Sequence, residues 1–158
     1  MSAGKVCTPA DLLARIAALP RPLVFTNGVF DLLHRGHVEC LVQARALGAS
    51  LVVGLNSDAS ARALGKGPGR PLVPCDDRAA VLAALESVSL VAVFEQAAPL
   101  GLLESIRPDV YVKGGDYDMA GLPEAALVRT WGGRAVALPF LPGRSSTALL
   151  RRIQALPR

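Results

Sequence analysis

The only two histidines of the chain, His34 and His37, lie three residues apart within residues 26–37, TNGVFDLLHRGH. An apolar run precedes this segment and an amphipathic stretch follows it, which predicts a strand, a turn and the start of a helix. Side chains three residues apart on a helix share a face, so both imidazoles can contact one phosphate. Phosphoryl-type transfer adds negative charge to equatorial oxygens, and fixed imidazole donors stabilise that charge selectively. The spacing predicts catalysis without a covalent intermediate.

Gly28 and Gly36 lie within residues 26–37 and have no side chain where the backbone must approach a ligand or a neighbouring element. A helix start presents unpaired N–H groups and a positive dipole end, which attract phosphate. Open α/β sheets also bind ligands beyond the carboxyl ends of their strands. Residues 26–37 therefore predict a polyphosphate site. The alternative is that both histidines are ordinary surface or core residues, and their shared position in one glycine-containing turn argues against it.

Basic residues elsewhere in the chain have positions suited to phosphate. Lys66 lies in the segment GKGPGRPLVP, whose glycines and prolines predict a mobile loop. Arg78 lies at the start of a predicted helix, and Lys113 ends a predicted strand just before Gly114 and Asp116. Taken alone, Lys66 and Arg78 are better explained as solvated surface charges. A left-handed turn explains the glycine after Lys113 but not the flanking charges.

A second helix start carries hydroxyl groups. Arg144, Ser145, Ser146 and Thr147 open the predicted C-terminal helix, where hydroxyls and free N–H groups can bind phosphate. An ordinary N-cap is the alternative, and both roles are compatible because one hydroxyl suffices for the cap. Trp131 stands beside two glycines and could stack on a base, although a lone Trp at a helix end is more often a core residue.

Apolar, β-branched-rich runs alternate with amphipathic stretches along the whole chain, which indicates βαβ units around a buried parallel sheet. The expected strands span residues 23–27, 50–56, 90–95, 109–114 and 134–140. Four expected helices span residues 36–47, 76–85, 99–106 and 123–131. Three more are expected from their starts: one from a capping-box-like pattern at residues 8–11, one after a cap at 56–58, and one that begins at 145 or 146. We expect one α/β, Rossmann-like domain over residues 1–158, with a five-stranded parallel sheet flanked by helices.

Composition limits the class of protein. Apolar residues make up 51% of the chain without an uninterrupted run of the roughly 18 residues that a membrane span needs, and the first residues lack a secretory apolar stretch. Three cysteines, Cys7, Cys40 and Cys75, form neither a CxxC pair nor an even set, so we expect a cytoplasmic protein with no membrane partner. Net charge is +4, but aromatic content is only 4%, which favours small anionic substrates over nucleic acid.

The motif GxFDxxHxGH over residues 28–37 resembles the signature of the HxGH nucleotidylyltransferase superfamily. The segments LNSDAS, KGPGRP, VYVKGGDYD and RSSTALLRRI are similar to the adenylyltransferases that make ADP-heptose, so the resemblance covers nearly the whole chain. It implies transfer of AMP from ATP to D-glycero-β-D-manno-heptose 1-phosphate with Mg2+, as a step toward the lipopolysaccharide core. The length of the chain implies the stand-alone form of this enzyme rather than a fusion with a sugar kinase. We also expect a homo-oligomer of unspecified size.

The resemblance assigns roles position by position. It implies that His34 and His37 hold the ATP phosphates and the transition state, and that Lys66 closes over the phosphates. It implies nucleotide contacts at Asn27, Gly28, Phe30, Asp31, Gly36, Lys113, Gly114, Asp116, Arg144, Ser145, Ser146 and Thr147. It implies contacts with the sugar phosphate at Asp31, Lys66, Arg78 and Asp116, with Asp31 near the sugar or the metal. No residue is assigned as a metal ligand.

Two positions depart from the usual pattern of the superfamily, where Cys or Thr is common at Val29 and Thr is common at Ser146. Within the superfamily, CMP transfer to glycerol 3-phosphate is an alternative activity. From other classes, a dinucleotide-binding module would need a GxGxxG turn after the strand at residues 23–27, which is missing from the sequence. An RNA-binding module remains as a third alternative, because class I aminoacyl-tRNA synthetases have a similar HxGH turn.

Overall fold

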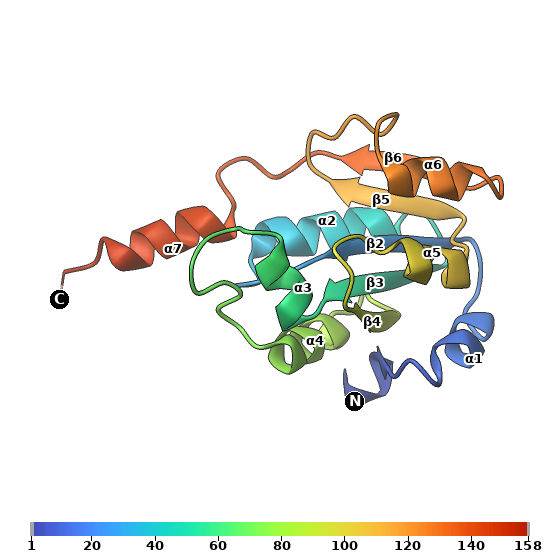
Figure 1. Ribbon diagram of the computed structural model, residues 1–158, viewed down its shortest axis with the longest axis horizontal. Coiled ribbons are helices and arrows are strands. Elements are labelled where there is room, and N and C mark those ends of the chain that lie inside the picture. Colours follow the sequence, from blue (N-terminus) through green and yellow to red (C-terminus); the bar gives the residue numbers. More distant parts are fainter. Residues whose placement is uncertain (1, 158) are drawn as a thin grey trace.

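A computed structural model describes residues 2–157 as one α/β fold around a parallel sheet (Figure 1). The strands are β1 (Val6–Cys7), β2 (Leu23–Gly28), β3 (Ser50–Asn56), β4 (Leu90–Phe94), β5 (Val110–Gly114) and β6 (Arg134–Leu138). They lie in the order β1-β4-β3-β2-β5-β6, and every neighbouring pair is parallel. The expected five-stranded sheet therefore gains a sixth strand. The additional strand, β1, pairs Val6 with Val91 and Cys7 with Ala92, and two residues are too few to show a periodicity.

Seven α-helices and one 3₁₀-helix are described within residues 2–157. They are η1 (Ser2–Lys5), α1 (Leu12–Ala17), α2 (Arg35–Arg45), α3 (Asp58–Ala63), α4 (Cys75–Ala84), α5 (Leu100–Ile106), α6 (Pro123–Arg129) and α7 (Ser146–Gln154). None of these helices has the length and hydropathy needed to cross a bilayer. Figure 1 shows α7 projecting away from the rest of the fold, and α7 has no buried residue.

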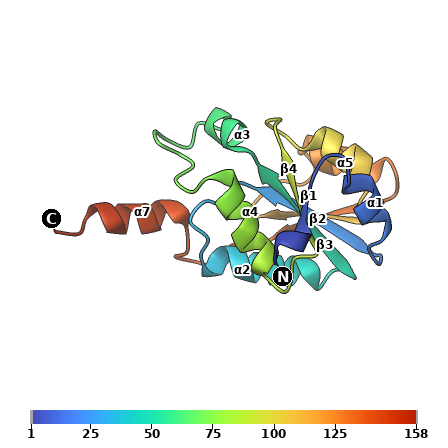
Figure 2. The same cartoon turned by 90° about the horizontal axis from the view of Figure 1, so that it is seen from below.

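Each face of the sheet has its own core. Val24 and Val53 pack with residues of α2 and α4 on one face. Their neighbours Phe25 and Val52 pack with residues of α1, α5 and α6 on the other face, and Figure 2 shows these two helix layers on opposite sides of the strands. Because successive strand residues point to opposite faces and both faces are covered, the central strands read as continuous apolar runs.

Helix starts agree with the sequence at two of three capping sites. Ser57 accepts a hydrogen bond from Ser60 N at α3, and Ser145 accepts one from Ala148 N at α7, as predicted. The first helix differs, since it begins at Leu12 rather than within residues 8–11. The Thr8 half of the predicted capping box is present, because Thr8 Oγ1 accepts from Asp11 N, but the Asp11 side chain makes no cap hydrogen bond.

The strand order determines where a ligand can bind. The connection from β2 passes through α2 to β3 on one side, whereas the connection from β5 passes through α6 to β6 on the other. Adjacent strands whose connections run in opposite directions leave a crevice at their carboxyl ends. In this sheet those strands are β2 and β5, which end at Gly28 and Gly114.

Candidate active site

The turn after β2 is conformationally unusual. Two residues with a Cβ, Phe30 and Leu32, adopt left-handed backbone conformations with φ of 52° and 50°. Each such conformation costs on the order of 1 kcal/mol or more, and in folded proteins they cluster at functional sites. The turn buries Asp31 and places His34 at the N-cap of α2, so the surrounding contacts must hold it in shape.

The two histidines replace the usual hydroxyl and carboxylate of a capping box. Gly36 N donates to His34 Nδ1 at 3.1 Å, and His34 N donates to His37 Nδ1 at 3.4 Å. A neutral imidazole that accepts at Nδ1 carries its proton on Nε2. The backbone thus selects the same tautomer for His34 and His37, and each keeps one Nε2–H donor free. The rings stack with centroids 4.0 Å apart and an interplanar angle of 25°.

Electrostatics keep this pair uncharged. Burial lowers the pKa of His37 to about 4, with further lowering by His34 and Lys66 and a smaller opposing effect of Asp31. Burial and then the nearby Arg144 lower the pKa of His34 as well. At neutral pH the pair therefore acts through N–H donors and not as two cations, which removes repulsion between stacked rings.

Gly36 lets the start of α7 approach the histidine turn. A Cβ at Gly36 would lie 2.9 Å from His34 Cε1 and 3.1 Å from Arg144 Cβ, both closer than normal contact. Ser146 Oγ also donates to the backbone oxygen of Asp31 at 2.5 Å. Two segments more than a hundred residues apart in sequence, the histidine turn and the start of α7, are therefore in direct contact.

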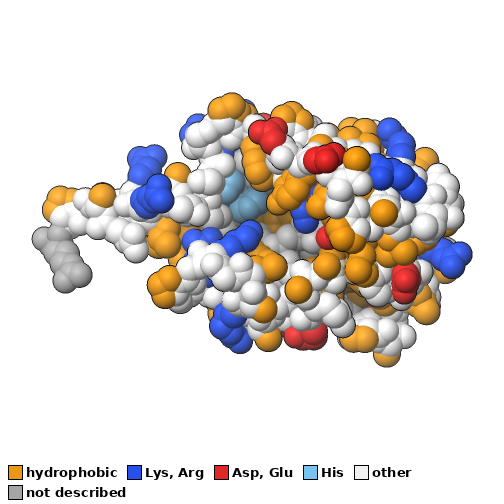
Figure 3. Space-filling view, turned by 45° about the horizontal axis from the view of Figure 1, so that its top comes forward, with side chains coloured by type: hydrophobic (Ala, Val, Ile, Leu, Met, Phe, Trp, Pro, Cys, Tyr) orange, Lys and Arg blue, Asp and Glu red, His pale blue; other side chains and the backbone are white. Residues whose placement is uncertain are grey.

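The α7 start forms one wall of an open pocket. Lining this pocket are His34, Gly143, Arg144, Ser145, Ala148, Leu149 and Arg152. Figure 3 shows the histidine side chains in a hollow with Lys and Arg side chains nearby. The predicted binding residues Arg144 and Ser145 thus lie beside His34, while exposed Thr147 does not line the pocket.

The carboxyl end of β5 supplies a second set of the predicted residues. Burial lowers the pKa of Lys113, Glu124 partly opposes that effect, and Lys66 adds to it. Lys66 also lowers the pKa of His37, so its positive charge acts on both the histidine turn and the end of β5. Asp116 follows Gly115, whose φ is 118°, and is exposed to solvent.

Asn27 is oriented from beneath by a tyrosine. Burial raises the pKa of Tyr111, and the protonated hydroxyl donates to Asn27 Oδ1 at 3.0 Å. This bond fixes the Asn27 amide at the end of β2. Phe30 packs beside His37 with ring centroids 5.5 Å apart, and a Cβ at Gly28 would lie 3.1 Å from the Phe30 ring.

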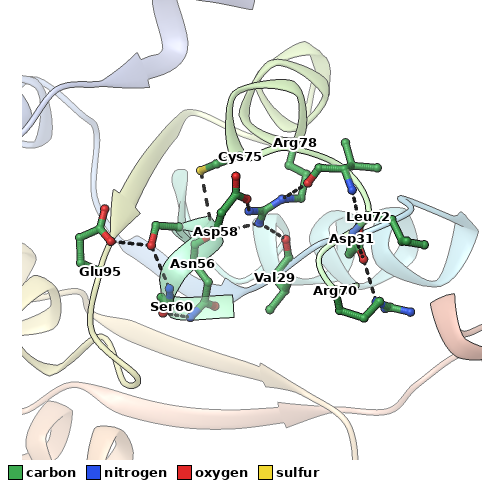
Figure 4. A network of polar contacts seen from close by, with 12 residues as sticks. Val29, Asp31, Asn56, Asp58, Ser60, Arg70, Leu72, Cys75, Arg78 and Glu95 are labelled. Carbon is green, nitrogen blue, oxygen red and sulfur yellow. Dashed lines mark hydrogen bonds and ion pairs between the residues drawn. The ribbon is translucent and has the colours of Figure 1, made fainter. Parts of the chain in front are cut away.

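Two predicted substrate residues are placed differently from the expectation. The Asp31 carboxylate is 3% exposed, and it accepts hydrogen bonds from Leu72 N at 2.9 Å and Val73 N at 3.0 Å. It also pairs with Arg70 at 2.9 Å, so its oxygens face the protein rather than a sugar or a metal (Figure 4). Because Leu72 and Val73 lie 41 and 42 positions from Asp31, the local motif gives no indication of these hydrogen bonds.

Arg78 is the second of these residues. Its guanidinium is buried and donates to the backbone oxygens of Val29 at 2.6 Å, Asn56 at 2.9 Å and Val73 at 2.9 Å, and to Asp58 Oδ1 at 2.7 Å. These bonds occupy the guanidinium within the protein, as Figure 4 shows. The geometry gives Arg78 a structural position behind the site instead of a direct contact with substrate.

A model of the cytidylyltransferase-like family matches residues 25–151, a span that includes the histidine turn, the Lys66 loop and the first part of α7. The chain belongs to this family. It is 60% identical over 153 residues to the D-beta-D-heptose 1-phosphate adenylyltransferase of Bordetella bronchiseptica, covering 96% of this chain and 94% of that protein. It is therefore a nucleotidyltransferase of the adenylyltransferase type.

A second relative is longer. The bifunctional protein HldE of Streptomyces coelicolor is 58% identical over 144 residues, which cover 91% of this chain and 31% of that protein. The chain thus matches about a third of HldE. Among solved structures, the lipopolysaccharide core biosynthesis protein from Thermoplasma volcanium aligns with a TM-score of 0.63 and 26% identity over 75% of this chain and 95% of that one. A pantoate-beta-alanine ligase from Francisella tularensis, at 13% identity, 90% and 68% coverage and a TM-score of 0.61, shares the fold.

Sequence reasoning missed residues whose partners are distant in the chain. Arg70 and Tyr111 each contact a predicted site residue, Asp31 and Asn27, across 39 and 84 positions. The only available signal for Arg70 was its place at the end of the glycine-rich loop.

Trp131 lies away from the histidines. It donates from Nε1 to Pro108 O, just before β5 begins, and so lies at the amino end of the strands, whereas the histidines lie at the carboxyl end.

Proposed function

We propose that the chain transfers AMP from ATP to D-glycero-β-D-manno-heptose 1-phosphate, forming ADP-heptose and pyrophosphate for the lipopolysaccharide core. The observation that carries this proposal is the pair of neutral imidazoles, each with a free Nε2–H, at the crevice between β2 and β5. The heptose substrate is supported by 60% identity to a heptose 1-phosphate adenylyltransferase across 96% of the chain.

The chemistry needs no covalent intermediate. An oxygen of the sugar phosphate attacks the α-phosphorus of ATP, a new P–O bond forms, and the bond to the β-phosphate breaks with its electron pair leaving on pyrophosphate. The attacking oxygen is already ionised at neutral pH, so no general base is required. The Nε2–H groups of His34 and His37 donate to the α-phosphate oxygens as their charge increases, which lowers the barrier.

Cationic groups and a helix start would hold the leaving pyrophosphate. Arg144, the cap residue Ser145 and Ala148 of α7 line the pocket beside His34. Lys66 and Lys113 would supply further positive charge, since Lys66 lowers the pKa of both His37 and Lys113. Charge stabilisation on the leaving group complements the donors at the α-phosphate.

Mg2+ belongs to this proposal as part of the ATP substrate. Within residues 2–157 no group of three or more His, Cys, Asp or Glu side chains is arranged to hold a metal, and the Asp31 carboxylate is occupied by protein donors. Mg2+ in phosphoryl transfer is often held largely by substrate phosphates and water.

Pyrophosphate release measured with each of the four NTPs against a panel of sugar 1-phosphates tests the function. ATP with the heptose 1-phosphate is expected to turn over fastest. Faster turnover of CTP with glycerol 3-phosphate would refute the proposal in favour of the cytidylyltransferase alternative. The cytoplasmic location and the homo-oligomer both stay predictions, and sedimentation of the purified protein tests the second.

A further inference from the structure

The loop between α3 and α4 has one loose end and one fixed end. Gly65, Gly67 and Gly69 have φ of 65°, 120° and 72°, and nothing lies within 4 Å of a Cβ built on any of them. Residues 62–69 are exposed, and Lys66 lies among them. The part that carries Lys66 is therefore free of packing.

The other end of the loop is bound to the histidine turn by Asp31. The Arg70 Nε lies 2.9 Å from Asp31 Oδ2, with the two side chains only 11% and 3% exposed. Leu72 N and Val73 N donate to the two oxygens of the same carboxylate. Three donors from residues 70–73 of the loop thus converge on one buried side chain of the GxFDxxHxGH motif (Figure 4).

Arg78 joins the same two segments a second time. It donates to Val73 O in the loop and to Val29 O in the histidine turn, at 2.9 and 2.6 Å. Its bond with Asp58 Oδ1 at 2.7 Å also ties in the first residue of α3, the helix that precedes the loop. The root of the loop and the histidine turn consequently form one rigid unit.

We propose that Asp31 is a positioning residue that acts through Lys66: with Arg70 it anchors the loop so that Lys66 closes over the histidine pair from a fixed point. This inference rests on the proposed function of Lys66. From Arg70 to Lys66 there are four residue steps, so the Lys66 backbone stays within roughly 14 Å of the anchor. A short tether keeps the ammonium at high effective concentration over the phosphates. The glycines at 67 and 69 supply the hinge.

A double-mutant cycle between Arg70→Ala and Lys66→Ala tests the anchor. Arg70→Ala is expected to lower kcat by roughly 10-fold or more, because misplacing a catalytic group by about 1 Å can cost 100-fold. In the Lys66→Ala background the same change should have little further effect, since both act through one ammonium group. Arg62→Ala is the matched control, an exposed arginine at the opposite end of the loop, and it should leave kcat unchanged.

Two outcomes of the cycle would overturn the proposal. Losses that multiply would show that Arg70 does not act through Lys66. Normal turnover in Arg70→Ala together with an inactive Asp31→Asn would show that Asp31 contacts a substrate directly instead of acting through Arg70. A second readout is independent of sugar substrate: ATP should protect residues 64–69 from amide hydrogen exchange in the wild type and less so in Arg70→Ala. Unchanged exchange in the wild type on ATP addition would also overturn the proposal, even if pyrophosphate release confirmed the reaction.

Discussion

At the residue scale, the histidine pair illustrates what spacing can and cannot predict. Two histidines three apart after a strand predicted a phosphate site, and the structure places both rings at the carboxyl end of β2. The capping box between them was not predictable, because His34 and His37 take positions usually filled by Ser or Thr and Glu or Gln. The buried role of Asp31 was equally hidden, since its partners lie 39 to 42 positions away.

Substitution of His37 tests the donor role. His37→Ala should lower kcat by roughly 100-fold, about 2.7 kcal/mol in activation free energy, with a smaller change in ATP affinity. His37→Asn should recover part of the loss, because an amide N–H can still donate. Single-turnover rates and melting temperatures on the same preparations decide the matter. Near-normal turnover in folded His37→Ala would contradict the mechanism.

The lowered pKa of His37 predicts a pH dependence of stability. Above pH 6.5 both folded and unfolded chains hold a neutral imidazole, so this residue adds no slope. Between 6.5 and about 4 only the unfolded chain binds the proton, and the free energy of unfolding falls as pH decreases. The Tm of the wild type should therefore fall relative to that of His37→Asn over this range. Parallel Tm profiles for the two proteins would count against a depressed pKa in the folded state.

At the element scale, long apolar runs were predictable and short or locally capped elements were less so. The strand at residues 50–56 has the predicted bounds because seven buried residues give a clear signal. β1 was missed, since Val6 and Cys7 become a strand only by pairing with β4.

Two glycine substitutions separate close packing from helix propensity. Gly36→Ala would push a Cβ against His34 and Arg144, so it should disturb the capping box and lower kcat. Gly101→Ala is the control: Gly101 lies within α5 with nothing within 4 Å of a built Cβ, and the change should stabilise the fold by about 0.5–1 kcal/mol. Urea unfolding and steady-state kinetics on both variants provide the comparison. Equal kcat in the two variants would exclude a role for close packing at Gly36.

At the scale of the whole molecule, the alternation of strands and helices in the sequence predicts the fold class and the location of the site. It does not predict that α7 projects from the body of the fold. Amphipathic sequence at residues 146–154 predicts a helix without indicating whether it packs on the body. In the structure no residue of α7 is fully buried, Ser146 and Leu150 are half-buried, and the start of the helix meets the site through Ser146 and the pocket beside His34. The core and the start of α7 beside the histidine turn are thus separate parts of this molecule.

This separation predicts the result of removing α7. A chain ending at Arg144 loses no buried apolar residue of either core, so its Tm should change little. It loses Ser145, Ala148, Leu149 and Arg152 from the wall beside His34, together with the Ser146 hydroxyl that donates to Asp31 O. ATP affinity should fall while the far-ultraviolet circular dichroism of the sheet and remaining helices persists. Calorimetric titration with ATP and thermal unfolding measure the two effects on one sample. A large drop in Tm with unchanged ATP affinity would assign α7 to stability, and the phosphate contacts would then have to come from β2, β5 and the Lys66 loop alone.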